Sequence, residues 1–168
     1  PKVAEKLSEL HVGWFEEPVS PTENAKELAQ IAHQVSMPIA GGEDGYGTDF
    51  FDHLIQGGAV NVIMPDIKFC GGVVEAYKAG TSAIQAGGQI SLHNPSGPIS
   101  QLASAHVTAA ISGSMPLEHA VGEADWRAEL MSPPERIYDG RLWFPEGNGI
   151  GAALNQDVIS HKGTKWKV

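Results

Sequence analysis

Five acidic or imidazole side chains recur at nearly constant spacing along the chain. Glu16, Glu43, Asp66, His93 and Glu118 lie 23 to 27 residues apart, each at the end of a short apolar segment typical of a β-strand. In a barrel of parallel strands the carboxyl ends of all strands meet at one mouth, so these side chains would converge there. The spacing therefore predicts one site built from four carboxyl groups and an imidazole.

Two of these residues, Glu16 and Glu43, could bind a divalent metal, because carboxylate oxygens are the hard donors that Mg²⁺ prefers. A simpler alternative stays open, in which Glu16 is a solvated strand end and Glu43 belongs to the Gly41–Gly42 turn. Successive side chains of an extended chain alternate, so Glu17 should point away from Glu16. We expect a structural role for Glu17.

Asp66 and His93 end consecutive predicted strands and could form an acid–base pair. The carboxylate would then orient the imidazole and raise its basicity, which would make His93 a general base. In the alternative, the ring of His93 only satisfies a backbone carbonyl beside Asn94 and Pro95. Lys68 follows Asp66 by two residues and is either a second base or an ion-paired surface lysine.

Strand-like and helix-like segments alternate in residues 1–120. The predicted strands are His11–Phe15, Met37–Gly41, Val60–Pro65, Gln89–Leu92 and Met115–Leu117, and the predicted helices are Thr22–Val35, Thr48–Gln56, Gly72–Gln85 and Pro98–Ile111. This alternation favours an α/β fold with a parallel sheet, and the absence of a GxGxxG loop after the first strand favours a barrel over a Rossmann sheet. A complete barrel usually needs roughly 250 residues. We therefore expect about five of its strands.

The alternation stops near Val121, and residues 121–168 are rich in Trp, Pro and Gly. They include a predicted turn at Asp139–Gly140. We expect an irregular segment that packs toward another domain.

The composition narrows the possible partners. Twenty acidic and 11 basic residues give a net charge of -9, which argues against nucleic acid and anionic membranes as partners. The apolar runs fall short of the ~20 residues that span a bilayer, and a single cysteine, Cys70, excludes an intrachain disulfide. We expect a cytoplasmic protein whose sequence continues upstream of Pro1.

Five short motifs together resemble the mandelate racemase branch of the enolase superfamily. They are WFEEP at 14–18, GGE at 41–43, MPD at 64–66 with Gly71–Gly72 following, SLHNP at 91–95, and PLE at 116–118. Each motif is short, but their order and spacing are specific.

The resemblance implies the C-terminal part, strands four to eight, of a modified (β/α)7β barrel that holds one Mg²⁺ with three carboxylates. Glu16 matches the second ligand, Glu43 the third, Asp66 and His93 the acid–base dyad, and Glu118 the residue that hydrogen-bonds the enolate oxygen. The chain has no counterpart of the capping domain, the first three strands, the first Asp ligand or the strand-two base. We therefore expect the chain alone to be inactive.

The implied reaction removes the proton next to a carboxylate and gives an enediolate. We expect a small carboxylate substrate, a sugar acid that is dehydrated, and a homo-oligomeric enzyme. An alternative is a racemase, epimerase or cycloisomerase of the same superfamily in which Lys68 is a base. An alternative of another class is a non-catalytic barrel remnant that serves in binding or assembly.

Overall fold

The centre of the molecule is a parallel four-stranded sheet. The computed structural model describes residues 2–19 and 24–164. The sheet order follows the chain, and its strands are β1 (Phe15–Glu16), β2 (Ile39–Gly41), β3 (Val62–Ile63) and β4 (Gln89–Ile90). Phe15 lies opposite Ile39, Ala40 opposite Val62, and Ile63 opposite Ile90. The register therefore aligns the carboxyl ends of all four strands.

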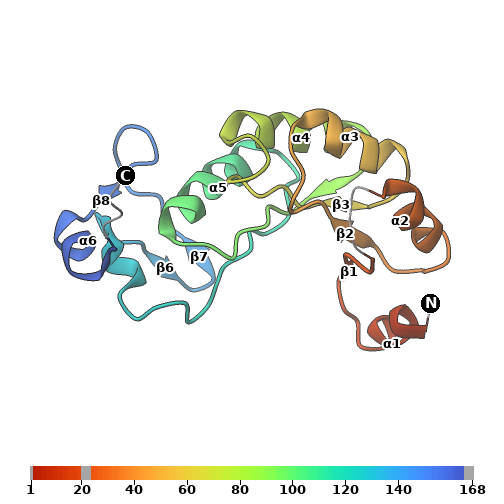
Figure 1. The fold of residues 1–168 in the computed structure, drawn as a ribbon, viewed down its shortest axis with the longest axis horizontal. Coiled ribbons are helices and arrows are strands. Elements are labelled where there is room, and N and C mark those ends of the chain that lie inside the picture. The colour runs from red at the N-terminus through yellow and green to blue at the C-terminus, as the bar shows by residue number, and fades with distance from the viewer. Residues whose placement is uncertain (1, 20–23, 165–168) are drawn as a thin grey trace.

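Helices connect the strands and cover one face of the sheet (Figure 1). The crossover helices are α2 (Ala25–Ala32), α3 (Thr48–Gln56) and α4 (Val73–Gln85), and α5 (Pro98–Ala110) follows β4. Local sequence explains where two of them begin. The side chain of Asn24 accepts a hydrogen bond from the backbone of Glu27, and Pro98 occupies the first turn of α5.

Alternate strand residues are buried on opposite faces of the sheet. Ile39 and Ile63 belong to the core that the helices form with the sheet, whereas their neighbours Ala40 and Val62 pack on the other face with Met64. Burial on both faces is typical of parallel sheets. The second face is the one that would line the interior of a closed barrel.

Two predicted strands differ from the structure. The segment Met115–Leu117 is not a strand, although the amide of Met115 donates to the carbonyl of Ile90 at 2.9 Å and so places the segment beside β4. The first strand begins at Phe15 rather than His11, because His11 has a φ of 56° in the turn that follows helix α1 (Lys2–Glu9). Thr22, the predicted start of the first crossover helix, lies outside the described residues.

Residues 121–164 carry short regular elements where we expected irregular chain. They are the 3₁₀ helix η1 (Arg127–Leu130), the strands β5 (Met131–Ser132), β6 (Ile137–Tyr138), β7 (Arg141–Leu142) and β8 (Ala153–Leu154), and helix α6 (Gln156–Lys162). β5 pairs with β8, and β6 with β7, both antiparallel. The predicted turn at Asp139–Gly140 joins β6 to β7, with positive φ angles of 52° and 67°.

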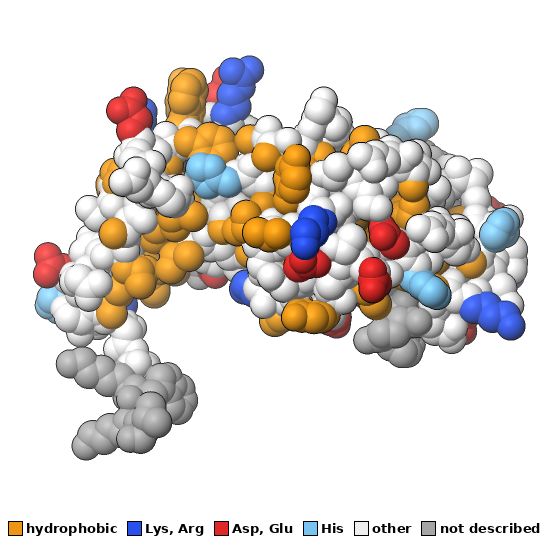
Figure 2. All heavy atoms as spheres, turned by 90° about the horizontal axis from the view of Figure 1, so that it is seen from above, with side chains coloured by type: hydrophobic (Ala, Val, Ile, Leu, Met, Phe, Trp, Pro, Cys, Tyr) orange, Lys and Arg blue, Asp and Glu red, His pale blue; other side chains and the backbone are white. Residues whose placement is uncertain are grey.

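Hydrophobic side chains reach the surface between charged ones on the side shown in Figure 2. Within the described part of the chain, no helix has both the length and the apolar character needed to cross a bilayer.

Candidate active site

His93 lies between two carboxylates at the carboxyl end of the sheet. Its Nδ1 is 3.0 Å from Oδ2 of Asp66, and its Nε2 is 3.2 Å from Oε2 of Glu43. Asp66 and His93 also form a parallel bridge just beyond β3 and β4, which extends the pairing of these two strands. Residues from the ends of three strands thus meet in one cluster.

Asp66 is the most enclosed member of this cluster, with no exposed side-chain surface. Its Oδ1 accepts the backbone N–H of Lys68 at 2.8 Å, and the Lys68 ammonium lies 3.3 Å from Oδ2, the atom that also faces His93. A buried carboxylate with these partners keeps a fixed orientation. Lys68 is therefore ion-paired in this structure, and its Nζ also lies 4.8 Å from the centre of the Phe69 ring.

The imidazole of His93 faces a carboxylate on each side. A carboxylate accepts hydrogen bonds, so Nδ1 is placed to donate to Asp66, while Nε2 lies close to Glu43. Burial raises the pKa of Glu43, the positive charge of His93 opposes this rise, and the nearby acids Glu17, Asp44 and Glu16 add to it. An imidazole between two carboxyl groups, one of them with a raised pKa, is an arrangement that suits proton transfer.

Glu17 positions the turn that carries Glu43. Its Oε1 accepts the backbone N–H of Gly42 at 2.9 Å, which ties the end of β1 to the end of β2. Gly42 has a φ of 109°, and a β-carbon there would lie 3.2 Å from the Phe51 ring. Glycine is thus required at this turn for two reasons, its backbone conformation and the close ring. The expected structural role of Glu17 agrees with this contact.

Glu16 and Glu118 both line a cavity of 280 Å³ and have other hydrogen-bond partners than the imidazole. Trp14, Met64, Ser91, Pro116 and Leu117 also line this cavity. Glu16 is exposed, and its Oε2 accepts the Trp14 indole N–H at 3.1 Å. Glu118 accepts the backbone N–H of Asn94 at 2.7 Å. The five predicted residues therefore form two groups, an imidazole cluster and a pair of glutamates beside a cavity.

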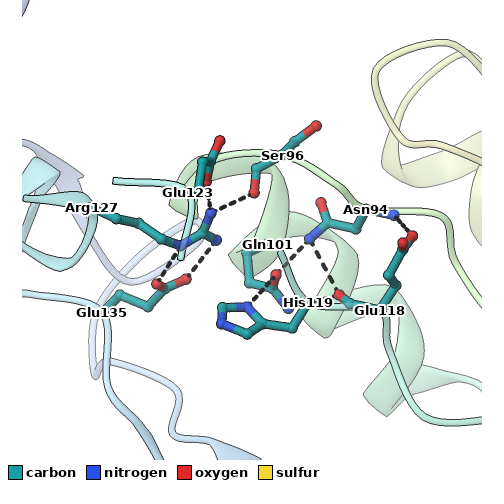
Figure 3. Close-up of polar contacts among 8 residues, drawn as sticks. All are labelled: Asn94, Ser96, Gln101, Glu118, His119, Glu123, Arg127 and Glu135. Carbon is teal, nitrogen blue, oxygen red and sulfur yellow. Dashed lines mark hydrogen bonds and ion pairs between the residues drawn. The ribbon is translucent and has the colours of Figure 1, made fainter. Parts of the chain in front are cut away.

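The sequence analysis missed two residues of this region, Asn94 and Gln101, both buried. The amide group of Asn94 donates to Oε1 of Gln101 at 2.5 Å, and both side chains donate to the backbone carbonyl of Glu118 (Figure 3). They link the residue after His93 to Glu118. The sequence offered one signal for Gln101: it is a polar residue within the largely apolar predicted helix Pro98–Ile111, which could have indicated a buried polar contact.

The candidate metal ligands in this region are the carboxylate oxygens of Glu16 and Glu43. In the described ranges no three Asp, Glu, His or Cys side chains group in a way that could hold a metal ion. Glu16 and Glu43 have the hard carboxylate chemistry that Mg²⁺ prefers. A cation would offset the repulsion from nearby acids, which adds to the effect of burial in raising the pKa of Glu43. The chemistry of these two residues therefore fits part of a magnesium site.

Comparison with known proteins shows the family. Residues 1–158 match the family described as enolase C-terminal domain-like, and the chain belongs to it. A D-xylonate dehydratase from Haloferax volcanii is 33% identical over 158 residues, which are 94% of this chain and 38% of that protein. A D-galactarolactone cycloisomerase from Agrobacterium fabrum is 28% identical and shares 94% of this chain and 44% of its own length.

A solved structure supports the same fold. The mandelate racemase/muconate lactonizing enzyme from Jannaschia sp. CCS1 superposes with a TM-score of 0.88 at 25% identity, over 99% of this chain and 42% of that one. The fold is thus part of a (β/α)7β barrel that is not closed within this chain, as the sequence predicted. The chain spans less than half the length of each of these relatives.

Proposed function

We propose that this chain forms part of an Mg²⁺-dependent enzyme that removes the proton next to the carboxylate of a sugar acid and dehydrates the resulting enediolate. The contact between Asp66 and His93, 3.0 Å between buried or nearly buried side chains, carries the proposal. A histidine whose Nδ1 is held by a carboxylate keeps Nε2 for proton transfer.

Each residue has a defined part in this proposal. Asp66 orients the ring of His93, and Nε2 of His93 moves the proton. Glu118 lines the cavity and, in its protonated form, would donate a hydrogen bond to the oxygen on which negative charge develops. Glu16 and Glu43 would hold Mg²⁺, which supplies positive charge near the substrate carboxylate. At least one further metal ligand would come from outside the described residues.

Dehydration is supported by the sugar-acid dehydratases among the relatives, of which the D-xylonate dehydratase is 33% identical. A β-hydroxyl in the substrate would leave after proton removal, and the imidazolium of His93 could protonate it. Isomerisation is the second candidate, favoured by the cycloisomerases among the relatives. In that reaction Lys68 would have to leave its ion pair with Asp66 to act as a base. The homo-oligomeric state and the cytoplasmic location stay predictions.

The test uses the protein at its natural length with Mg²⁺ and a panel of aldonic and aldaric acids. Dehydration is followed by formation of the 2-keto product, and isomerisation by change of configuration. We expect 2-keto acid from at least one substrate, lost in His93→Asn and kept in His53→Asn, a matched change at an exposed histidine on α3. Binding to a partner with no turnover of any acid would instead support the non-catalytic alternative.

A further inference from the structure

Arg127 is a buried cation in the C-terminal segment, only 9% exposed. Its guanidinium donates to Glu135 through two hydrogen bonds, of 2.9 and 3.3 Å, and to the backbone carbonyl of Ser96 at 2.8 Å. It also contacts Glu123 (Figure 3). Four of its contacts thus lie on three different segments of chain.

The chemistry of this contact is specific to arginine. The side chain of Glu135 is 4% exposed, so both partners of the main ion pair are removed from water. A buried ion pair persists only where its hydrogen bonds are satisfied, and a planar guanidinium can bind a carboxylate with two bonds while a third N–H reaches elsewhere. In Arg127 this further N–H group, on Nη1, donates to the Ser96 carbonyl. The pair is therefore a rigid link to Ser96.

Ser96 lies on the loop between His93 and the start of α5 at Pro98. This loop is held at two points: the backbone N–H of Asn94 donates to Glu118, and the carbonyl of Ser96 accepts from Arg127. The bond to Glu118 comes from the barrel portion of the chain, and the bond from Arg127 comes from the C-terminal segment. Between them they restrain the residues that follow the imidazole.

We propose that Arg127 and Glu135 are positioning residues that clamp the loop 93–97 and so hold the His93 ring in line with Asp66. The clamp gives the C-terminal segment a part in the site. Its effect on turnover rests on the proposed function above, whereas the restraint on the loop does not. The two parts can therefore be tested separately.

The restraint is tested by hydrogen exchange and mass spectrometry on the natural-length protein without substrate, in Arg127→Met, Arg127→Lys and Glu135→Gln. Lys6→Met removes an exposed ion pair with Glu9 and is the matched control. In Arg127→Met we expect peptides spanning 93–101 to exchange at least ~10-fold faster, while peptides spanning 48–63 stay unchanged and show that the sheet is folded. Exchange in 93–101 equal to that of Lys6→Met would overturn the proposal.

The effect on turnover is read from kcat and KM separately. We expect kcat to fall by ~10- to 100-fold in Arg127→Met with KM changed by less than about threefold, because a misplaced proton-transfer group slows chemistry more than binding. Arg127→Lys should recover part of kcat, since an ammonium can reach Ser96 without binding Glu135 through two bonds. Faster exchange with unchanged kcat would also overturn the proposal. If the wild-type protein turns over no acid, the proposed function fails, and exchange alone decides whether the clamp exists.

Discussion

The imidazole cluster of Glu43, Asp66 and His93 and the pair Glu16 and Glu118 differ in how many of their contacts come from this chain. Around His93 the side chains are enclosed and bonded to each other: Asp66 has no exposed surface, and the His93 side chain is 14% exposed. Glu16 is exposed at β1, an edge strand of the sheet, and accepts the indole N–H of Trp14, which directly precedes this strand. The imidazole cluster is built by the chain itself, whereas the β1 side needs more protein.

The physical reason lies in the sheet. β3 has hydrogen-bonded strands on both sides, and β4 lies between β3 and the segment of Met115, whose amide donates to Ile90. The bridge between Asp66 and His93 extends the pairing of β3 and β4. Among the described residues β1 pairs with a strand on one side only. We therefore expect the proposed metal site to depend on further protein more than the proposed proton-transfer cluster does. The following changes test this division.

The largest effect is expected at the imidazole cluster. Asp66→Asn cannot hold Nδ1–H of His93 as a carboxylate does, so we expect kcat for sugar-acid turnover to fall by about 10²- to 10⁴-fold in the natural-length protein. Asp49→Asn, on an exposed position of α3, is the control. A kcat within about threefold of the wild-type value would show that the enclosed cluster takes no part in the chemistry.

A smaller effect is expected at the β1 side. Glu16→Gln removes a carboxylate from the predicted metal site, and we expect Mg²⁺ affinity to fall by about 10- to 100-fold or more, as loss of a supporting group alone already does at metal sites. Titration calorimetry of the natural-length protein measures it, with Glu5→Gln on α1 as a control. Unchanged affinity in Glu16→Gln would mean that the exposed glutamate is a solvated strand end.

The link between the two groups runs through Gln101. Gln101→Leu leaves buried polar groups of Asn94 and Glu118 with fewer partners, so we expect the free energy of unfolding to fall by about 1–3 kcal/mol. Denaturant unfolding measures this difference, and Gln30→Leu on the exposed face of α2 is the control. Equal stability of the two variants would show that the Asn94–Gln101 contact in Figure 3 adds nothing.

Cys70 reports on how closed the loop after β3 is. The residue is fully buried, and burial raises the pKa of its thiol, so little thiolate forms near neutral pH. We expect alkylation by iodoacetamide at pH 8 to be at least ~10-fold slower in the native protein than in urea. Equal alkylation rates in the native protein and in urea would mean that the loop after β3 is as open to solvent as the β1 side.

Much of the sheet could be predicted from sequence, and the reasons are local. Apolar segments ending in a polar residue indicate parallel strands, and consecutive strands indicated that Asp66 and His93 would be neighbours. The contact of His93 with Glu43 could not be predicted, because it depends on the turn that Gly42 makes after β2. Met115–Leu117 has a strand-like sequence, but its backbone contact with β4 is the hydrogen bond from Met115 to Ile90 and no longer ladder forms.

The C-terminal segment was the least predictable part. Its strands are two residues long, too short for any periodic pattern to show. The contact between Arg127 and Ser96 joins residues 31 positions apart across irregular chain, and an arginine there looks like an ordinary surface residue in the sequence. Tertiary packing, rather than local propensity, decides such contacts.

Exchange of the proton next to the carboxylate tests the central claim most directly. The natural-length protein is incubated with Mg²⁺ and sugar acids in ²H₂O, and deuterium at that carbon is followed by NMR in wild type and His93→Asn. The account predicts exchange or loss of that proton in the wild-type protein and its abolition in His93→Asn. Equal exchange in both proteins would contradict the assignment of His93 as the group that moves the proton.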